Sequence, residues 1–434
     1  RLRETSALAK HSRMSARQPR VAVMQLGARH AFALPAAFAE TGSLARFDTD
    51  FAMSGLSVLS SAFTTRSARR LPDHLAPLTH HAPARAIANH LLAQTLKRRD
   101  ATETLARHRY RTAAAFDAQC ARRDYRGITH LAAINGEAVE TVRAARDAGV
   151  RTVLDVVIPP SWHDTVADEA RRYPGWGTPQ ANWATASAAP DAIDRNVTAL
   201  HLADGLLCPS PAVRDDLVTT YGVASHRTHL VPYAVAPKFF AVLNRPEPGR
   251  ILFPGTADLR KGIHILAMAA AELLSRKPDL TFVIAGDASP IVREHPLCRP
   301  FTFLGRISPA RMMQEYARAD VCVLPSLAEG SAGATYESLA AGVPLVTTPD
   351  AGSVARDGIE GRIVPAGDPA ALADAIVDIV GNRDRRAALA GAARTRAAAF
   401  DWASYGQRIR AAVLGETAPV ALSQAEETRE AVPA

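Results

Sequence analysis

Two glutamates, Glu329 and Glu337, flank the part of the sequence that is best suited to chemistry. A run of small residues lies between them and follows an apolar segment at 321–324. The apolar segment predicts a buried strand, and the residues from about 335 predict a helix. The small residues therefore form the turn after a strand, where open parallel sheets bind their ligands.

The chemistry of this turn fits a ligand that carries both phosphates and hydroxyls. Small side chains let a diphosphate approach the backbone, and the start of a helix supplies unpaired N–H groups and a positive dipole end. The carboxylates of Glu329 and Glu337 repel phosphate, but they accept hydrogen bonds from sugar and ribose hydroxyls. The run therefore fits a nucleotide sugar. A strand–loop–helix turn with two solvated glutamates is the alternative.

Two cations form a second group of candidate residues. Arg260 and Lys261 precede Gly262 in a loop that begins at Gly255, and Lys261 is one of only five lysines in the chain. Cleavage of a glycosyl–phosphate bond builds negative charge on the departing diphosphate, and fixed cations stabilise that charge. We expect Arg260 and Lys261 to do this without a metal ion or cofactor, since two fixed cations suffice. An exposed loop pair is the alternative.

Strands and helices alternate along the chain and would position these residues. Apolar runs predict strands at 20–26, 47–51, 128–134, 152–158, 205–208, 228–231, 251–253, 281–285, 301–304, 321–324 and 345–348. Helical patterns lie between most of them, which predicts an α/β fold of two doubly wound, Rossmann-like domains. A loop-rich insertion over a cleft is expected after Pro160, where three tryptophans occur.

The alternation restarts after a segment that is rich in proline and polar residues, which predicts the domain boundary. We expect a first domain at 20–243, a linker at 244–250, a second domain at 251–396 and a C-terminal helix at 397–413 that crosses back. The termini at 1–19 and 414–434 are expected to be disordered.

Composition excludes several classes of protein. The chain has 434 residues, of which 47% are hydrophobic and 22% charged. It contains no run of 18 apolar residues, so no membrane-spanning helix is predicted. The start of the chain is rich in arginine and lacks the apolar core of a secretory signal, so a cytoplasmic location is expected. The four cysteines are far apart, which argues against a zinc site.

Charge indicates anionic partners, because the formal net charge is +8. Residues 66–111 contain ten Lys or Arg and five His against three acids. A solvated basic face is one interpretation, and peripheral contact with an anionic lipid surface is another. Nucleic acid is not expected, since Tyr110 is the one aromatic residue interleaved with these basic ones. The sequence contains neither a GxGxxG motif nor a Walker loop, so it indicates neither a dinucleotide-dependent enzyme nor a P-loop enzyme.

The run that ends at Glu337 resembles the family 4 glycosyltransferases, which have the GT-B fold and a Glu-x7-Glu motif. The surrounding segments resemble the same family, including its Gly-x5-Lys-Gly loop and its base-pocket turn. These segments are 203–210, 230–233, 255–262, 303–308, 361–369 and 372–376. The resemblance covers about 20–413 and implies two Rossmann-like domains that face a central cleft.

The resemblance also implies roles for residues. Glu337 would bind the ribose hydroxyls, Glu329 the hydroxyls of the donor sugar, and the turn with Arg306 and Ile307 the base. Backbone N–H groups would hold the β-phosphate at Gly330, Ser331, Ala332, Gly333 and Ala334. The expected activity is retaining transfer (EC 2.4) from a nucleotide sugar to a glycan, a lipid-linked or a small-molecule acceptor, as in polysaccharide biosynthesis.

In the first domain of this family a histidine often lines the reactive centre. His130, placed after the strand at 128, and His163 are the candidates, although each could be a plain loop or core histidine. Gly27, at the end of the first strand, would allow donor or acceptor to approach, or simply form a turn. His264 is expected on the outer face of its helix.

Two departures from the family pattern leave other functions open. Thr256 stands where many members have Arg, and Ala234 and Ala236 interrupt the usual residues after Pro232 and Tyr233. A nucleotide-sugar binding module without activity would bind the donor but not turn it over. A GT-B epimerase would need no acceptor.

Overall fold

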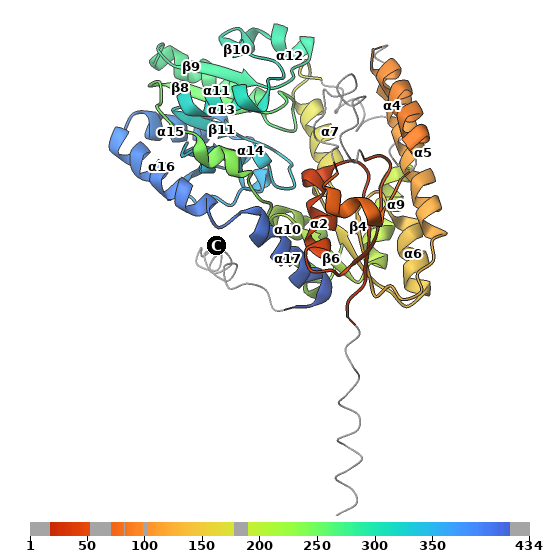
Figure 1. Ribbon diagram of the computed structural model, residues 1–434. Coiled ribbons are helices and arrows are strands. Elements are labelled where there is room, and N and C mark those ends of the chain that lie inside the picture. The colour runs from red at the N-terminus through yellow and green to blue at the C-terminus, as the bar shows by residue number, and fades with distance from the viewer. Residues whose placement is uncertain (1–17, 53–70, 82, 99–101, 178–189, 417–434) are drawn as a thin grey trace, which may run out of the picture.

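The computed structural model describes residues 18–52, 71–81, 83–98, 102–177 and 190–416 (Figure 1). Two parallel sheets lie in this part of the chain, and helices cover both of them (Figure 1). The predicted α/β class with two doubly wound domains is confirmed. The expected disordered termini lie almost wholly outside the described residues.

The first sheet has seven strands in the order β3-β2-β1-β4-β5-β6-β7, and every neighbouring pair is parallel. Its central strands are buried apolar runs, as sheets covered on both faces require. The strands are β1 (Val21–Met24), β2 (Leu44–Asp48), β3 (Thr79–His80), β4 (His130–Ile134), β5 (Arg151–Asp155), β6 (Gly205–Cys208) and β7 (Thr228–Leu230).

The second sheet has six parallel strands in the order β10-β9-β8-β11-β12-β13. This is the Rossmann order, in which the topology reverses between the first and fourth strands, here β8 and β11. The strands are β8 (Arg250–Pro254), β9 (Thr281–Ala285), β10 (Phe301–Phe303), β11 (Val321–Leu324), β12 (Leu345–Thr347) and β13 (Gly361–Ile363).

Helices connect the strands, and several begin at a side-chain cap followed by proline, as at Ser210, Ser308 and Asp368. In the first domain they are α2 (Ala33–Ala39), α4 (Pro83–Arg98), α5 (Thr102–Ala121), α6 (Val139–Asp147), α7 (Trp162–Arg172), α9 (Pro190–Leu202) and α10 (Pro211–Thr219). In the second they are α11 (Ile263–Arg276), α12 (Pro290–Glu294), α13 (Pro309–Arg318), α14 (Gly333–Ala340), α15 (Pro369–Val380) and α16 (Arg383–Ala397).

The last described helix, α17 (Trp402–Leu414), packs against α2 of the first domain (Figure 1). Arg410 Nη1 donates to the carbonyl oxygen of Ala37 at 2.9 Å, and Arg408 Nη2 donates to that of Pro232 at 3.1 Å. Residues 244–250 lie against the second domain, where Asn244 Nδ2 donates to the carbonyl oxygens of Tyr316 and Ala319. Contacts of α17 and of residues 244–250 therefore join the two domains at the two places where the chain passes between them.

Parts of the expected organisation are wrong. The second strand covers Leu44–Asp48 rather than 47–51, and the short strands β3 and β13 were not predicted. Residues 162–172, expected as loop, form α7, because its apolar face packs against the core of the second domain through Val166. Trp183 lies outside the described residues. None of the described helices is long and apolar enough to span a bilayer.

Candidate functional site

The loops that follow β8 and β11 touch each other at the point where the second sheet reverses its topology. The backbone N–H of Leu327 donates to the carbonyl oxygen of Arg260 at 2.8 Å, and Arg260 Nη1 donates to that of Ala328 at 3.0 Å. Gly262 has φ +73°, and a Cβ there would overlap the carbonyl oxygen of Pro325. Only glycine satisfies both constraints, so Gly262 allows the two loops to meet.

Glu329 lies between the two predicted cations. Its Oε1 is 2.6 Å from Arg260 Nη1 and 2.6 Å from Lys261 Nζ, and all three side chains are largely buried. Burial raises the pKa of Glu329, but Lys261 and Arg260 outweigh burial and hold the pKa below its ordinary value. The carboxylate is therefore ionised at neutral pH and neutralises part of the charge of the cations.

Gly255 and Asp258 shape the loop that carries Lys261. Gly255 has φ +136°, and a Cβ there would lie 3.2 Å from Lys261 Cδ, so the lysine stem runs across the glycine. Asp258 Oδ1 accepts a hydrogen bond from the backbone N–H of Lys261 at 2.9 Å. Asp258 was not predicted as a site residue. Its position three residues before Lys261 is the pattern of a side chain that closes a turn.

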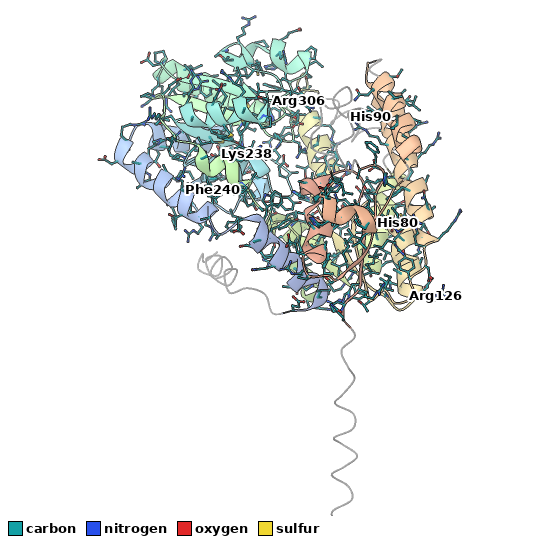
Figure 2. The ribbon with its side chains drawn as sticks, viewed as in Figure 1. His80, His90, Arg126, Lys238, Phe240 and Arg306 are labelled. Carbon is teal, nitrogen blue, oxygen red and sulfur yellow. The ribbon has the colours of Figure 1, made fainter. Side chains whose placement is uncertain are left out.

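Glu337 lies in α14, one turn after the small-residue loop. The hydroxyl of Tyr316 donates to Glu337 Oε2 at 3.1 Å and also lies 3.2 Å from the carbonyl oxygen of Ala334. Burial raises the pKa of Glu337 to about 7, while Tyr316 and the cation of Lys238 act in the opposite direction. Lys238 lies in the 3-10 helix η5 (Pro237–Ala241) and is labelled in Figure 2.

The start of α14 provides the backbone donors expected for an anion. No side chain caps the helix at Ala332, so the N–H groups of Gly333 and Ala334, in the first turn, have no partner inside the helix. The N–H of Ala332 differs, because it donates to the carbonyl oxygen of Ala351 at 2.9 Å. The expectation that Ala332 holds a phosphate is therefore corrected.

The two residues before Ala332 contact different domains. Ser331 Oγ donates to the carbonyl oxygen of Gly352 at 2.6 Å and lies 2.7 Å from the hydroxyl of Tyr336. A Cβ on Gly330 would overlap the carbonyl oxygen of Val157, which follows β5. In this arrangement Ser331 fixes the loop within the second domain, and Gly330 lies against the first domain.

A pocket of about 60 Å³ lies on the first-domain side of this contact. Its lining residues are Asn135, Val157, Ile158, Pro160, Trp162, His163, Ile193, Asn196 and Val197. Val157 both lines the pocket and touches the Gly330 loop, so the pocket adjoins the second domain. Burial lowers the pKa of His163 to about 4, and its imidazole is therefore neutral at physiological pH.

His130 is not placed as expected. It is the first residue of β4 rather than a residue that follows a strand, and its neighbours in the sheet are Val21 and Arg151. It therefore lies at the amino ends of the strands, away from the edge where parallel sheets bind ligands. Gly27 does lie at the carboxyl end of β1, with φ +70° and its N–H 2.8 Å from Asp50 Oδ1.

The predicted base-pocket turn follows the edge strand β10. Arg306 is exposed and pairs with Asp287 at 3.2 Å (Figure 2). Ile307 is half-buried against the hydrophobic core. The turn thus offers an exposed cation and an apolar surface beyond the loops that follow β8 and β11.

His264 is also not where the sequence placed it. The side chain is fully buried rather than on an outer face, and its Nε2 lies 2.6 Å from Glu169 Oε1 of α7. Trp176 stacks on His295 with ring centroids 3.8 Å apart. These pairs join the two domains and are structural rather than part of the site.

Residues 248–382 match the family model described as group 1 glycosyl transferases. This segment of the chain is therefore similar to the group 1 glycosyl transferases. The matched segment includes Arg260, Lys261, Glu329 and Glu337, and with them the loops that follow β8 and β11 and helix α14.

The curated relatives that the chain resembles are named as transferases. The chain is 31% identical over 172 residues to the D-inositol 3-phosphate glycosyltransferase of Corynebacterium urealyticum. That alignment covers 36% of this chain and 41% of the relative. It is 33% identical over 172 residues to the phosphatidyl-myo-inositol mannosyltransferase of Mycolicibacterium smegmatis, in an alignment that covers 38% of this chain and 45% of the relative. The chain thus spans less than half the length of these relatives.

The two-domain fold has a solved counterpart. The Anabaena Alr3699/HepE structure in complex with UDP aligns with a TM-score of 0.54 and 15% identity, over 90% of this chain and 98% of that one. At that identity the likeness shows the fold alone. The fold is GT-B, as the family resemblance implied.

Proposed function

We propose that this chain transfers a sugar, with retention of anomeric configuration, from a nucleoside-diphosphate sugar to a hydroxyl of an acceptor. The cluster of Arg260, Lys261 and Glu329 beside the uncapped start of α14 carries this proposal. Such an arrangement offers cations and free N–H groups to a diphosphate and carboxylates to hydroxyls.

The donor would lie along the two central loops. The ribose hydroxyls would donate to Glu337, and the diphosphate would accept from the N–H groups of Gly333 and Ala334. Arg260 and Lys261 would bind the diphosphate from the other loop. UDP in the Anabaena structure and the family match support a nucleoside-diphosphate donor.

Glu329 would change partners when the donor binds. In the donor-free protein its carboxylate satisfies Arg260 and Lys261. The diphosphate, with more charge, would take over both cations and leave Glu329 to accept hydroxyls of the donor sugar. The site would then develop its full positive charge only when a diphosphate is present.

In the reaction, the bond between the anomeric carbon and the phosphate oxygen breaks, and the electron pair stays on the phosphate. The acceptor oxygen forms its bond to the anomeric carbon from the same face and passes its proton to the leaving phosphate oxygen. Configuration is retained, and no protein side chain acts as base. The two cations stabilise the departing charge, so we propose that no metal ion or other cofactor takes part.

The acceptor would lie in the pocket that adjoins Gly330. Asn135 and Asn196 supply amide donors and acceptors there, and Trp162 supplies an aromatic face, which together suit a ring that carries hydroxyls. The names of the curated relatives support an inositol-like or lipid-linked polyol, and a glycan would bind by the same chemistry. Neutral His163 would contact an acceptor hydroxyl.

The test is a transfer assay with UDP-, GDP- and ADP-sugars and polyol, glycan and lipid-linked acceptors. Release of nucleoside diphosphate and formation of glycosylated acceptor are measured with and without EDTA. We expect transfer that EDTA leaves unchanged and that Lys261→Ala and Glu337→Ala strongly reduce, whereas Lys277→Ala, at an exposed lysine, has no effect. Donor binding without turnover would favour a binding module, for which Thr256 is the sequence argument. Change of the donor sugar without an acceptor would favour an epimerase.

A further inference from the structure

Helix α4 exposes an apolar stripe. Ile87, Leu91 and Leu92 are 43%, 57% and 48% exposed, and they are three of the six large hydrophobic side chains that stand out as exposed in the described residues. Ile87 and Leu91 are one helical turn apart, and Leu92 is adjacent. Ala88 and Thr95 are also exposed on this side of the helix, so the stripe carries no charge between residues 87 and 95, where the side chains are described.

The opposite side of α4 faces α5, which is its main packing partner. His108 Nε2 of α5 lies 3.1 Å from the carbonyl oxygen of Asn89, and Ala93 and Leu96 are half-buried on the same side. The two helices lie side by side at the edge of the first domain (Figure 1). The stripe therefore points away from the protein, although a helix that is apolar on both sides is normally covered.

The sequence around the stripe is rich in positive charge. Between residues 66 and 111 the chain has ten Lys or Arg and only three acids. Arg109 and Arg111 are exposed on α5, and His90 is exposed on α4 itself (Figure 2). Aliphatic side chains next to arginines are the combination that binds an anionic bilayer surface, since lipid chains cover the stripe and headgroups pair with the cations.

We propose that α4 and the adjoining part of α5 form a surface that docks the first domain on a membrane containing anionic phospholipids. The helix lies in the interface and does not span the bilayer, since α4 has only 16 residues. Nucleic acid would pair with the arginines but would leave Leu91 and Leu92 in water. The surface is independent of the proposed donor site, but it would bring the first domain to a lipid-linked acceptor.

The test is flotation of the full chain with vesicles of phosphatidylcholine alone or mixed with phosphatidylglycerol. We expect binding to the anionic vesicles only, and weaker binding as salt increases. Leu91→Glu should lower the partition coefficient more than about tenfold, because it places a charge where the bilayer would cover a leucine. Arg109→Ala should lower it about fivefold. The control is Leu243→Glu, at a leucine that is 71% exposed outside α4, which should bind as the wild type does.

Two results would overturn the proposal. One is equal binding of wild type and Leu91→Glu, or no binding to anionic vesicles. The other is that Leu91→Glu converts a dimer to a monomer in sedimentation velocity without vesicles, because α4 would then contact a second copy of the chain. Transfer to a soluble acceptor should be the same for wild type and Leu91→Glu. Failure of the vesicle experiment and failure of the proposed activity are therefore distinguishable.

Discussion

Glu329 and Lys261 form an ion pair across the two loops that meet at the centre of the second sheet, with 2.6 Å between Oε1 and Nζ. Arg260 Nη1 lies at the same distance from the same oxygen. A ligand diphosphate and Glu329 would therefore compete for one pair of cations, and this competition leads to opposite expectations for the carboxylate and for the lysine.

Replacement of Glu329 by Gln should tighten the binding of a free nucleoside diphosphate. The amide does not compete for Arg260 and Lys261, so the gain should be about fivefold, the equivalent of roughly 1 kcal/mol for a partly screened ion pair. Calorimetric titration with UDP and GDP measures it. Glu272→Gln, which alters an exposed pair with Arg276, is the control. Weaker binding by Glu329→Gln would show that the carboxylate supports the cations rather than competing with the ligand.

Replacement of Lys261 by Ala should lower kcat by about 100- to 1000-fold, the effect of losing one group that stabilises developing charge. The loss should appear at saturating donor, since the charge on the diphosphate increases in the transition state. Initial rates over a range of donor concentrations separate kcat from KM, and Lys277→Ala is the matched control. A change in KM alone would contradict a role in bond cleavage.

Donor binding should depend on pH through Glu337, whose pKa burial raises to about 7. Hydrogen bonds from the ribose hydroxyls favour the ionised carboxylate, so binding of the nucleotide sugar lowers this pKa and releases a proton. Affinity should therefore rise with pH, by up to about tenfold per unit between pH 6 and 7, and level off above 7. Calorimetry in two buffers of different ionisation enthalpy measures the released proton. Glu337→Gln should release none, and equal release by both proteins would refute the assignment.

The domain plan could be predicted because long apolar runs and helical spacing are local signals. Two strands were missed for physical reasons, since β3 has two residues and β13 begins with a glycine. Helix α7 was also missed, although Trp162, Val166 and Tyr173 recur at helical spacing. The prolines and tryptophans around it indicated a loop, and only contact with the other domain accounts for its apolar face.

The site could be predicted in part for the same reason. Glu337 and Lys261 follow strands closely in sequence, so the edge of the sheet on which they lie can be inferred. His130 was misplaced because it was expected to follow a strand, whereas both the predicted strand at 128–134 and β4 contain it near their amino ends. The pairing of His264 with Glu169 joins residues 95 positions apart, which no local pattern reveals.

Replacement of Gly330 by Ala should separate the domains locally and slow transfer. The new Cβ would overlap the carbonyl oxygen of Val157, so either the loop or the first domain must shift. A shift near 1 Å at a reacting centre costs about 100-fold in rate. Transfer rates and small-angle scattering measure the two effects. Gly391→Ala is the control for packing, because it lies in α16 outside the site and a Cβ there meets nothing within 4 Å. Wild-type rates for Gly330→Ala would show that this contact is not formed during catalysis.

The buried pair of Glu169 and His264 should contribute to the stability of the two-domain arrangement. Replacement of His264 by Ala removes the 2.6 Å contact and leaves Glu169 against the second domain without its partner. Loss of one partner from a buried pair costs about 3–5 kcal/mol, whereas exposed pairs contribute about 0–1 kcal/mol. Urea denaturation of His264→Ala should show the larger loss of unfolding free energy, and Glu272→Ala, in an exposed pair with Arg276, the smaller one.

The double variant of His264→Ala with Glu169→Gln should recover part of the loss, because the amide carries no charge. Equal losses in the single and double variants would mean that packing of the imidazole, rather than the pair, stabilises this contact.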